Sequence, residues 1–337
     1  MTALELPLPT YRSGTDLIPA ADGPQTAKEF TSDQEVRWCP GCGDYAVLKA
    51  VPSFLPDLGL RRENIVFVSG IGCSSRFPYY LDTYGMHSIH GRAPSIATGI
   101  ATAREDLSVW VVTGDGDALS IGGNHLIHAL RRNVNMTILL FNNRIYGLTK
   151  GQYSPTSEVD KVTKSTPVGS LGHPFNPVSL ALGAEATFVA RTIDSDRKHL
   201  TAVLSATAAH RGTSFVEIYQ NCPIFNDGAF DAIKGSEANT HLLRLEPGVE
   251  VTVNGRAWAH DPPAADPADQ FAISPMGETA GPLGAGGPIP IGIFRQVERP
   301  YDDLARAQVA EARASVDGTD ADRLTQLINA GDTWNVG

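Results

Sequence analysis

The sequence lacks three features that would assign it to a common class of protein: many cysteines, an excess of basic residues and a long apolar run. Its 337 residues include four cysteines, which excludes a small scaffold built on several disulfides. Lys and Arg number 27 against 37 Asp and Glu, and the net charge of −10 would repel nucleic acid. No apolar stretch approaches the roughly 18 residues of a membrane span. The N-terminal stretch MTALELPLPTYRSGTDLIPA has no basic start followed by an apolar run, so we expect no secretory signal.

These absences predict a cytoplasmic protein with neither nucleic acid nor membrane among its partners. In that compartment, structural disulfides are rare. The four cysteines are therefore better interpreted as metal ligands, catalytic thiols or core residues.

The composition changes along the chain and divides it into three predicted parts. Residues 1–33 are polar, contain proline and show no clear period, which indicates an irregular N-terminal arm. Residues 34–235 alternate short apolar runs with helical patterns, as expected of one domain. Residues 236–337 form a C-terminal extension, in which we expect a Pro-, Gly- and Ala-rich loop over 260–290 to wrap the domain or a partner.

Continuous apolar strands with helices between them predict the fold class. Such strands are typical of a parallel α/β sheet with helices on both faces. The expected strands are Ile65–Ser69, Val109–Thr113, Met136–Phe141, Phe188–Arg191 and Ser214–Tyr219. The expected helices are Ser95–Arg104, Leu119–Arg132, Pro177–Leu182, Leu200–His210, Asp302–Ser315 and Ala321–Ala330.

The stretch WCPGCGD places two thiols, Cys39 and Cys42, on either side of a Pro-Gly turn. This pair fits a redox dithiol, half of a zinc site or half of an iron–sulfur site. The pair alone does not distinguish these possibilities.

Two further motifs follow neighbouring predicted strands. One strand ends in Gly114-Asp115-Gly116, and the next ends in Asn142-Asn143, one helix and one strand later. A right-handed crossover brings both ends to the same edge of a parallel sheet, where such folds bind ligands. Carboxylate and amide oxygens, with a backbone carbonyl at Ile145, are hard ligands that suit Mg²⁺ carrying a diphosphate. The glycines would let the backbone approach the phosphates. The alternative is two ordinary turns with polar tips.

This arrangement resembles that of thiamine-diphosphate enzymes, and further motifs narrow the resemblance. WCPGCGD, GIGCSSR from Gly70, HGRAPSIATG from His90, GDGDALSIGGNHLIHALRRN and NNRIYGLTKGQYSPTS occur in this order. Together they resemble the β subunits of 2-oxoacid:ferredoxin oxidoreductases, most nearly the 2-oxoglutarate branch. The resemblance covers residues 34–235, and PIPIGIFRQVERPYDDL over 288–304 is also similar to that family. It implies a thiamine-diphosphate-binding fold of the PP type.

The resemblance implies one [4Fe–4S] cluster held by the four cysteines of the chain. Thirty residues separate Cys42 from Cys73, and 148 separate Cys73 from Cys222. Structural zinc sites usually use two tight pairs, so a single tight pair disfavours zinc. A redox dithiol at Cys39 and Cys42 would leave the other two without a role. Cys73 and Cys222 each follow a predicted strand, at the expected ligand edge.

The resemblance further implies CoA-dependent oxidative decarboxylation of a 2-oxoacid, with electrons passed to ferredoxin. Mg²⁺ would be held by Asp115, Asn143 and the Ile145 carbonyl. For His90, which precedes a predicted helix in HGR, the alternative is a capping or packing role. The residues expected to contact or shape the cofactor site are Ile71, Gly72, Cys73, His90, Gly91, Gly114, Asp115, Gly116, Asp117, Asn143, Ile145, Leu148 and Thr149.

Lys150, in GLTKGQ, is the expected determinant of substrate choice. Pyruvate-type relatives tend to have Gly at this position, and a lysine could pair with the distal carboxylate of 2-oxoglutarate. The alternative is a solvated loop lysine. A pyruvate or branched-chain 2-oxoacid enzyme is the rival within the family.

The family's catalytic Glu comes from its α subunit, so we expect this chain to act only in a heteromer, most simply an α2β2 heterotetramer. A basic patch of Arg61, Arg62 and Lys49 is one hypothesis for the ferredoxin contact, and a charged, solvated face is the alternative. Two other classes stay open: a thiamine enzyme without iron, and an iron–sulfur carrier without thiamine.

Overall fold

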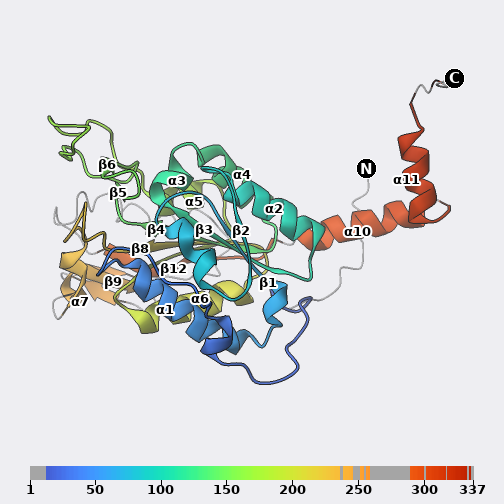
Figure 1. Cartoon of the computed structure of the whole chain (residues 1–337), viewed down its shortest axis with the longest axis horizontal. Helices are drawn as coiled ribbons and strands as arrows, with labels where there is room; N and C mark the ends of the chain where they lie inside the picture. Colours follow the sequence, from blue (N-terminus) through green and yellow to red (C-terminus); the bar gives the residue numbers. More distant parts are fainter. Residues whose placement is uncertain are drawn as a thin grey trace. The chain divides into compact units, whose positions relative to one another are not determined.

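The computed structural model describes residues 13–235, 238–245, 251–253, 256–258, 289–299, 301–315, 317–331 and 334. The chain divides into two compact units, Tyr11–Pro300 and Tyr301–Gly337 together with Met1–Thr10. The sheet and every predicted site residue belong to the larger unit (Figure 1).

Within the described residues, the main sheet has eight strands in the order β2-β1-β3-β4-β8-β7-β12-β9. All neighbouring pairs are parallel except β7 and β12, which are antiparallel. The strands of this sheet are β1 (Ile65–Ser69), β2 (Tyr84–His87), β3 (Ser108–Gly114), β4 (Met136–Asn142), β7 (Phe188–Ile193), β8 (Thr213–Tyr219), β9 (Leu242–Leu245) and β12 (Ile289–Gln296). Two small pairs lie outside it, β5 (Ile145–Tyr146) with β6 (Gln152–Tyr153), and β10 (Val251–Val253) with β11 (Arg256–Trp258).

Helices cover both faces of the sheet because its central strands are apolar on both faces. Alternate side chains of a strand point to opposite faces. Val109 and Val111 of β3 pack in one core with α2 and α4, whereas Trp110 and Val112 pack in another with α1 and α6 (Figure 1). The helices of the larger unit are α1 (Asp44–Phe54), α2 (Ala93–Ala103), α3 (Asp115–Leu119), α4 (Gly123–Arg132), α5 (Pro177–Gly183), α6 (Arg197–Ala209) and α7 (Ala238–His241), with 3₁₀ segments Ala27–Phe30, Leu55–Leu58, Arg62–Asn64, Ser74–Tyr80 and Asp231–Ile233.

The smaller unit contains two helices, α10 (Tyr301–Ala314) and α11 (Asp320–Ile328). A capping box starts α11, in which the Thr319 hydroxyl accepts from the Asp322 backbone N–H and the Asp322 side chain accepts from Thr319. Both helices were predicted within two residues of their bounds.

The predicted parallel sheet with helices on both faces is confirmed, and each of its five predicted strands is present. The predicted helix Leu119–Arg132 is wrong as one element, because it is two helices, α3 and α4, separated at Ser120–Gly122. A Cβ atom at Gly122 would lie 2.5 Å from the Asp117 carbonyl oxygen and 3.0 Å from Cα of Gly91. The break therefore allows the two glycine loops to touch.

Several elements were not predicted from the sequence. These are α1, the exposed edge strand β2, and strands β9 and β12 of the C-terminal extension, which extend the main sheet. The predicted loop over 260–290 lies outside the described residues, except that Ile289 and Pro290 begin β12. The predicted boundaries at 33 and 235 stay predictions. No helix among the described residues is long and apolar enough to cross a membrane.

Candidate functional site

The ends of β3 and β4 bring Asp115 and Asn143 to one edge of the sheet, as predicted. The two strands are in parallel register, with Gly114 opposite Phe141. Asp115 then opens the short helix α3, while Asn142 closes β4 and Asn143 follows it. Asp115 is 2% exposed and Asn143 is 9% exposed. Their oxygens therefore form a largely dry edge suited to a hard cation.

Two hydroxyl groups hold the carboxylate of Asp115. Its Oδ2 accepts hydrogen bonds from Ser154 Oγ at 2.5 Å and from Thr156 Oγ1 at 2.6 Å. Burial raises the pKa of Asp115 to about 6, although both hydroxyls act to lower it. A buried carboxylate that loses its charge so readily would be stabilised in its ionised form by a bound divalent cation. The residues present therefore fit Mg²⁺.

Asn143 is held from its other side. Its Oδ1 accepts from the backbone N–H of Ile145 at 3.1 Å. Its backbone carbonyl accepts from Asn226 Nδ2 at 2.9 Å, and the ammonium of Lys161 donates to the Oδ1 of Asn226. These contacts fix the loop that carries the predicted Ile145 ligand.

Gly116 has a packing role that the sequence did not reveal. A Cβ atom there would lie 2.2 Å from the ring of Tyr146, whose hydroxyl donates to the Gly116 carbonyl at 2.8 Å. The glycine thus lets the loop after β4 pack directly on α3.

Asp117 ties three loops together beside Asp115. Its Oδ1 accepts from the backbone N–H groups of Ile71 and Gly91 at 3.2 and 2.7 Å, and bonds His90 Nδ1 at 2.5 Å. Its Oδ2 accepts from Thr113 Oγ1 at 2.7 Å. The side chain is buried, so these contacts fix the predicted cofactor loops instead of facing solvent.

The four cysteines line one cavity of about 140 Å³. Cys39 is exposed, Cys42 and Cys73 are half-buried, and Cys222 is buried. A Cβ atom at Gly147 would lie 3.4 Å from Cys73 Sγ and 3.7 Å from Cys222 Sγ, so the glycine leaves room for both sulfurs. The other lining residues are Arg37, Trp38, Arg76, Asn143, Gly147, Leu148, Lys150, Pro223 and Phe225.

The thiols need a positive partner to ionise. Burial, followed by the charge of Asp44, raises the pKa of Cys73 to about 12 and that of Cys42 further. Iron would supply the compensating charge. Among the described residues, no three His, Cys, Asp or Glu side chains converge closely enough for a single metal ion. Four cysteines that line one cavity fit the thiolate set of an iron–sulfur cluster.

Comparisons with known proteins agree with this geometry. Residues 70–218 match the family described as thiamine pyrophosphate enzyme, C-terminal TPP binding domain. The 2-oxoglutarate oxidoreductase subunit KorB of Mycobacterium tuberculosis is 61% identical, over 95% of this chain and 91% of that protein. The chain belongs to the 2-oxoacid:ferredoxin oxidoreductase β subunits.

Other relatives support this assignment. The 2-oxoglutarate synthase subunit KorB of Methanocaldococcus jannaschii is 38% identical, over 65% of this β subunit and 84% of its own length. A solved 2-oxoglutarate:ferredoxin oxidoreductase from Magnetococcus marinus has 2-oxoglutarate, coenzyme A and succinyl-CoA bound. It superposes with a TM-score of 0.77 at 34% identity, covering 92% of this chain and 99% of that one. The β subunit is thus part of an oxidoreductase with a thiamine-diphosphate-binding fold.

Lys150 lies at the mouth of the cysteine cavity of the β subunit. Its backbone has φ = +83°, a left-handed conformation that favours glycine. The side chain is exposed and has no carboxylate partner among the described residues. Leu148 also lines this cavity, whereas Thr149 bonds Gln152 beside it.

Several site residues of the β subunit were missed from the sequence. They are the residues whose side chains hold Asp115 and Asn143 in place: Asn142, Ser154, Thr156, Glu217 and Asn226. Glu217 carried a usable signal, because a carboxylate within the apolar run SFVEIY must find a buried partner. The hydroxyls of SPTS carried none.

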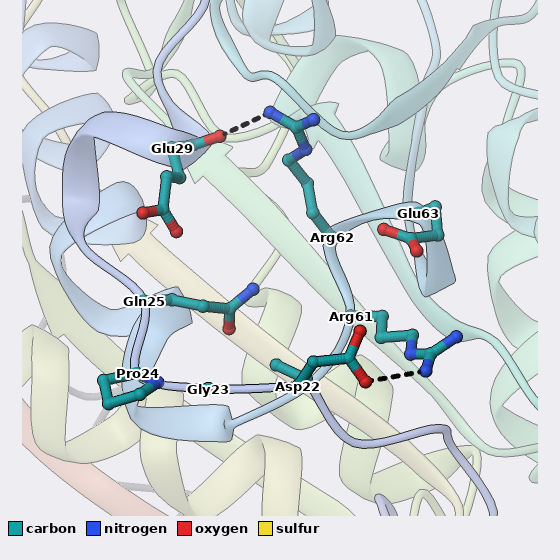
Figure 2. Close-up of a pocket in the computed structure, with 9 residues that line it drawn as sticks. Asp22, Gly23, Pro24, Gln25, Glu29, Arg61, Arg62 and Glu63 are labelled. Atoms are coloured by element: carbon teal, nitrogen blue, oxygen red, sulfur yellow. Dashed lines mark hydrogen bonds and ion pairs between the residues drawn. The ribbon is translucent and has the colours of Figure 1, made fainter.

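The predicted basic patch is not a free positive surface. Arg61 pairs with Asp22 at 2.9 Å, and Arg62 pairs with Asp82 at 2.5 Å. Figure 2 shows Arg61 against Asp22, and Arg62 donating to the backbone carbonyl of Glu29, around a cavity of about 350 Å³. These pairs offset part of the positive charge of the patch, and its contact with ferredoxin stays a prediction.

Proposed function

We propose that this β subunit, joined to an α subunit, catalyses the CoA-dependent oxidative decarboxylation of 2-oxoglutarate to succinyl-CoA and CO₂. Electrons would pass one at a time through a [4Fe–4S] cluster to ferredoxin. The observation that carries the proposal is that Asn143, a ligand proposed for Mg²⁺, lines the same cavity as the four cysteines. A cofactor on that edge would sit beside the cluster.

Asp115, Asn143 and the Ile145 carbonyl would hold Mg²⁺ and, through it, the diphosphate. When bound, thiamine diphosphate would supply a carbon nucleophile and an electron sink for decarboxylation. Asp117 orders the loops that would surround it, including Ile71 and Gly91. The remaining residues proposed to contact or shape the cofactor are Gly72, Cys73, His90, Gly114, Gly116, Leu148 and Thr149.

Cys39, Cys42, Cys73 and Cys222 would hold the cluster. Because Cys39 is exposed and Cys222 is buried, the Cys39 side is the expected exit for electrons to ferredoxin. The opposite side, at Cys73 and Cys222, adjoins Gly147 and the cofactor edge. The proposed electron path would therefore run from the cofactor edge to solvent.

An α subunit would complete the active site. A thiamine enzyme requires an acid against the pyrimidine ring, and the resemblance assigns that Glu to the α subunit. We therefore propose a cytoplasmic α2β2 heterotetramer that binds CoA and the 2-oxoacid.

Lys150 is proposed to bind the distal carboxylate of 2-oxoglutarate. A lysine at φ = +83° carries backbone strain of about 1–3 kcal/mol that glycine would relieve. Its side chain is exposed and lacks a carboxylate partner among the described residues, so it is available to a substrate anion. Strain retained at the mouth of a cavity is consistent with a functional side chain.

The test is an anaerobic assay of the co-purified αβ complex with 2-oxoglutarate, pyruvate and 2-oxoisovalerate. We expect wild-type protein to prefer 2-oxoglutarate. Lys150→Gly should lower kcat/KM for 2-oxoglutarate by about 10- to 100-fold, the effect of losing a charge-assisted hydrogen bond, while pyruvate turnover changes little.

Lys150→Ala is the matched control, because it removes the charge but retains the backbone strain. Both variants should lose 2-oxoglutarate activity alike, and only Lys150→Gly should gain stability. An equal effect of either variant on all three substrates would reject the specificity role. A wild-type preference for pyruvate or a branched-chain acid would replace the substrate assignment.

A further inference from the structure

A buried ion pair joins two neighbouring strands at the end of the sheet that carries the site. Arg191 of β7 donates from Nε to Oε2 of Glu217 in β8 at 2.6 Å. The two side chains are 3% and 0% exposed. The guanidinium also lies 5.1 Å from the ring centroid of Tyr219 and 5.5 Å from that of Phe294. Both charges are therefore removed from water.

Stability alone does not account for such a pair. Removing two charges from water costs about as much as their attraction returns, and apolar replacements are often equally stable. A retained buried pair is better explained by what else its atoms hold.

The pair continues into a chain of side chains that ends at Asp115. The second oxygen of Glu217, Oε1, accepts from Asn142 Nδ2 at 2.7 Å. Asn142 Oδ1 lies 2.9 Å from Thr156 Oγ1, and that hydroxyl lies 2.6 Å from Asp115 Oδ2. Every member of this chain is buried.

The ion pair holds one side of the Asn142 amide. Glu217 accepts from Arg191 Nε through Oε2 and from Asn142 Nδ2 through Oε1, so its two oxygens join the pair to the NH₂ group of Asn142. The Oδ1 of Asn142 lies on the other side, where it accepts from the backbone N–H of Arg144 at 3.1 Å. Because this N–H can only donate, it and Glu217 together determine which way the amide faces.

We propose that Arg191 and Glu217 are positioning residues for the magnesium–diphosphate site. They hold Asn142, which accepts from the Arg144 backbone N–H beside Asn143 and lies against Thr156, and so they keep Asp115 and the loop of Asn143 in the geometry for binding. This inference rests on the proposed function of that edge. It assigns a role to two side chains on strands β7 and β8, neither of which would touch the cofactor.

The test uses the double variant Arg191→Met/Glu217→Gln in the co-purified αβ complex. Both replacements are neutral, so no buried charge is left unpaired, but the NH₂ group of Asn142 loses its carboxylate acceptor. Mn²⁺ binding in the presence of thiamine diphosphate is measured by the EPR signal of free Mn²⁺. We expect the Mn²⁺ affinity to fall by about 10- to 100-fold, as for other residues that orient metal ligands.

Thr187→Val is the matched control. Thr187 directly precedes β7 at its other end and is equally buried in a polar network, but no chain of side chains links it to Asp115 among the described residues. Its Mn²⁺ affinity should equal that of wild type. Asn142→Ala, which keeps the ion pair and cuts the chain, should weaken Mn²⁺ binding as the double variant does.

The outcomes separate the two proposals. Wild-type complex that binds no Mn²⁺ with thiamine diphosphate would reject the proposed site and this inference together. If the wild-type complex binds Mn²⁺ and the affinity of either the double variant or Asn142→Ala is within twofold of wild type, only the positioning role is rejected. If Thr187→Val lowers the Mn²⁺ affinity as much as the double variant does, the effect is general destabilisation. That result would also reject the positioning role.

Discussion

Two buried polar networks lie at opposite ends of the same strands. At the amino ends of β7 and β8, Asn133 Oδ1 accepts from Thr187 Oγ1 at 2.5 Å and from the Thr213 N–H at 2.9 Å. Thr187 Oγ1 therefore accepts from His210 Nε2 at 2.8 Å, which assigns the proton to that nitrogen. This network is uncharged, and its described hydrogen bonds end on protein groups.

At the carboxyl ends, the corresponding network contains Arg191 and Glu217 and leads through Asn142 and Thr156 to Asp115. It carries formal charge and ends on a carboxylate whose pKa burial has raised to about 6. The contrast suggests that the neutral network, whose hydrogen bonds all end on protein groups, stabilises the fold. The charged network, which ends on the buried carboxylate of Asp115, supports ligand binding instead.

The largest effect on activity should come from replacing Cys222, which follows strand β8 at the carboxyl end of the sheet. Cys222→Ser is expected to lose the cluster, because serine is a poor ligand for iron and the site is buried. Iron and sulfide content and ferredoxin reduction should collapse, while the affinity for thiamine diphosphate is kept. Unchanged iron content in the purified αβ complex would show that Cys222 is not a ligand.

Asp115→Asn and Asn133→Ala should separate the two networks. Asp115→Asn removes a buried charge but keeps an oxygen acceptor, so Mn²⁺ affinity should fall by at least about 100-fold with little loss of stability. Asn133→Ala leaves buried donors unpaired at φ = +61°, and should cost about 2–4 kcal/mol of unfolding free energy with Mn²⁺ affinity unchanged. Mn²⁺ titration and chemical denaturation of both variants would measure the metal affinity and the unfolding free energy. A variant that loses both would contradict the division into one network for ligand binding and one for folding.

The smallest effect concerns pH and the amino-end network. Burial lowers the pKa of His210 from 6.5 to about 4. The unfolded chain takes up this proton below about pH 6.5 and the folded chain only near pH 4, so stability is complete above 6.5 and falls as the pH decreases. Between pH 7 and 5 the loss should be about 2 kcal/mol. Between pH 7 and 5, the unfolding free energy of His210→Gln should fall by about 2 kcal/mol less than that of wild type. An identical pH dependence in both proteins would contradict a buried neutral His210.

Much of the fold was predictable because the central strands are continuous apolar runs. IVFVS, VWVVT and MTILLF admit few other structures, and helical patterns lie between them. The split between α3 and α4 was not predicted, and at this break Gly122 packs against Gly91 from another part of the chain. Strand β2 was missed because YGMH is short and contains a glycine and a histidine, so no continuous apolar run marks it.

By itself, the sequence determined the residue types and the order of the site: two polar strand ends, four cysteines and a lysine where glycine fits the backbone. Parallel strands joined by a crossover end at the same edge of the sheet, so Asp115 and Asn143 could be placed at that edge in advance. Only the tertiary structure decided which side chains support them. Ser154, Asn226 and Glu217 lie far along the chain, and a hydroxyl or amide has no periodicity that reveals its partner. Their roles depend on side-chain directions that exist only after the strands and loops have packed.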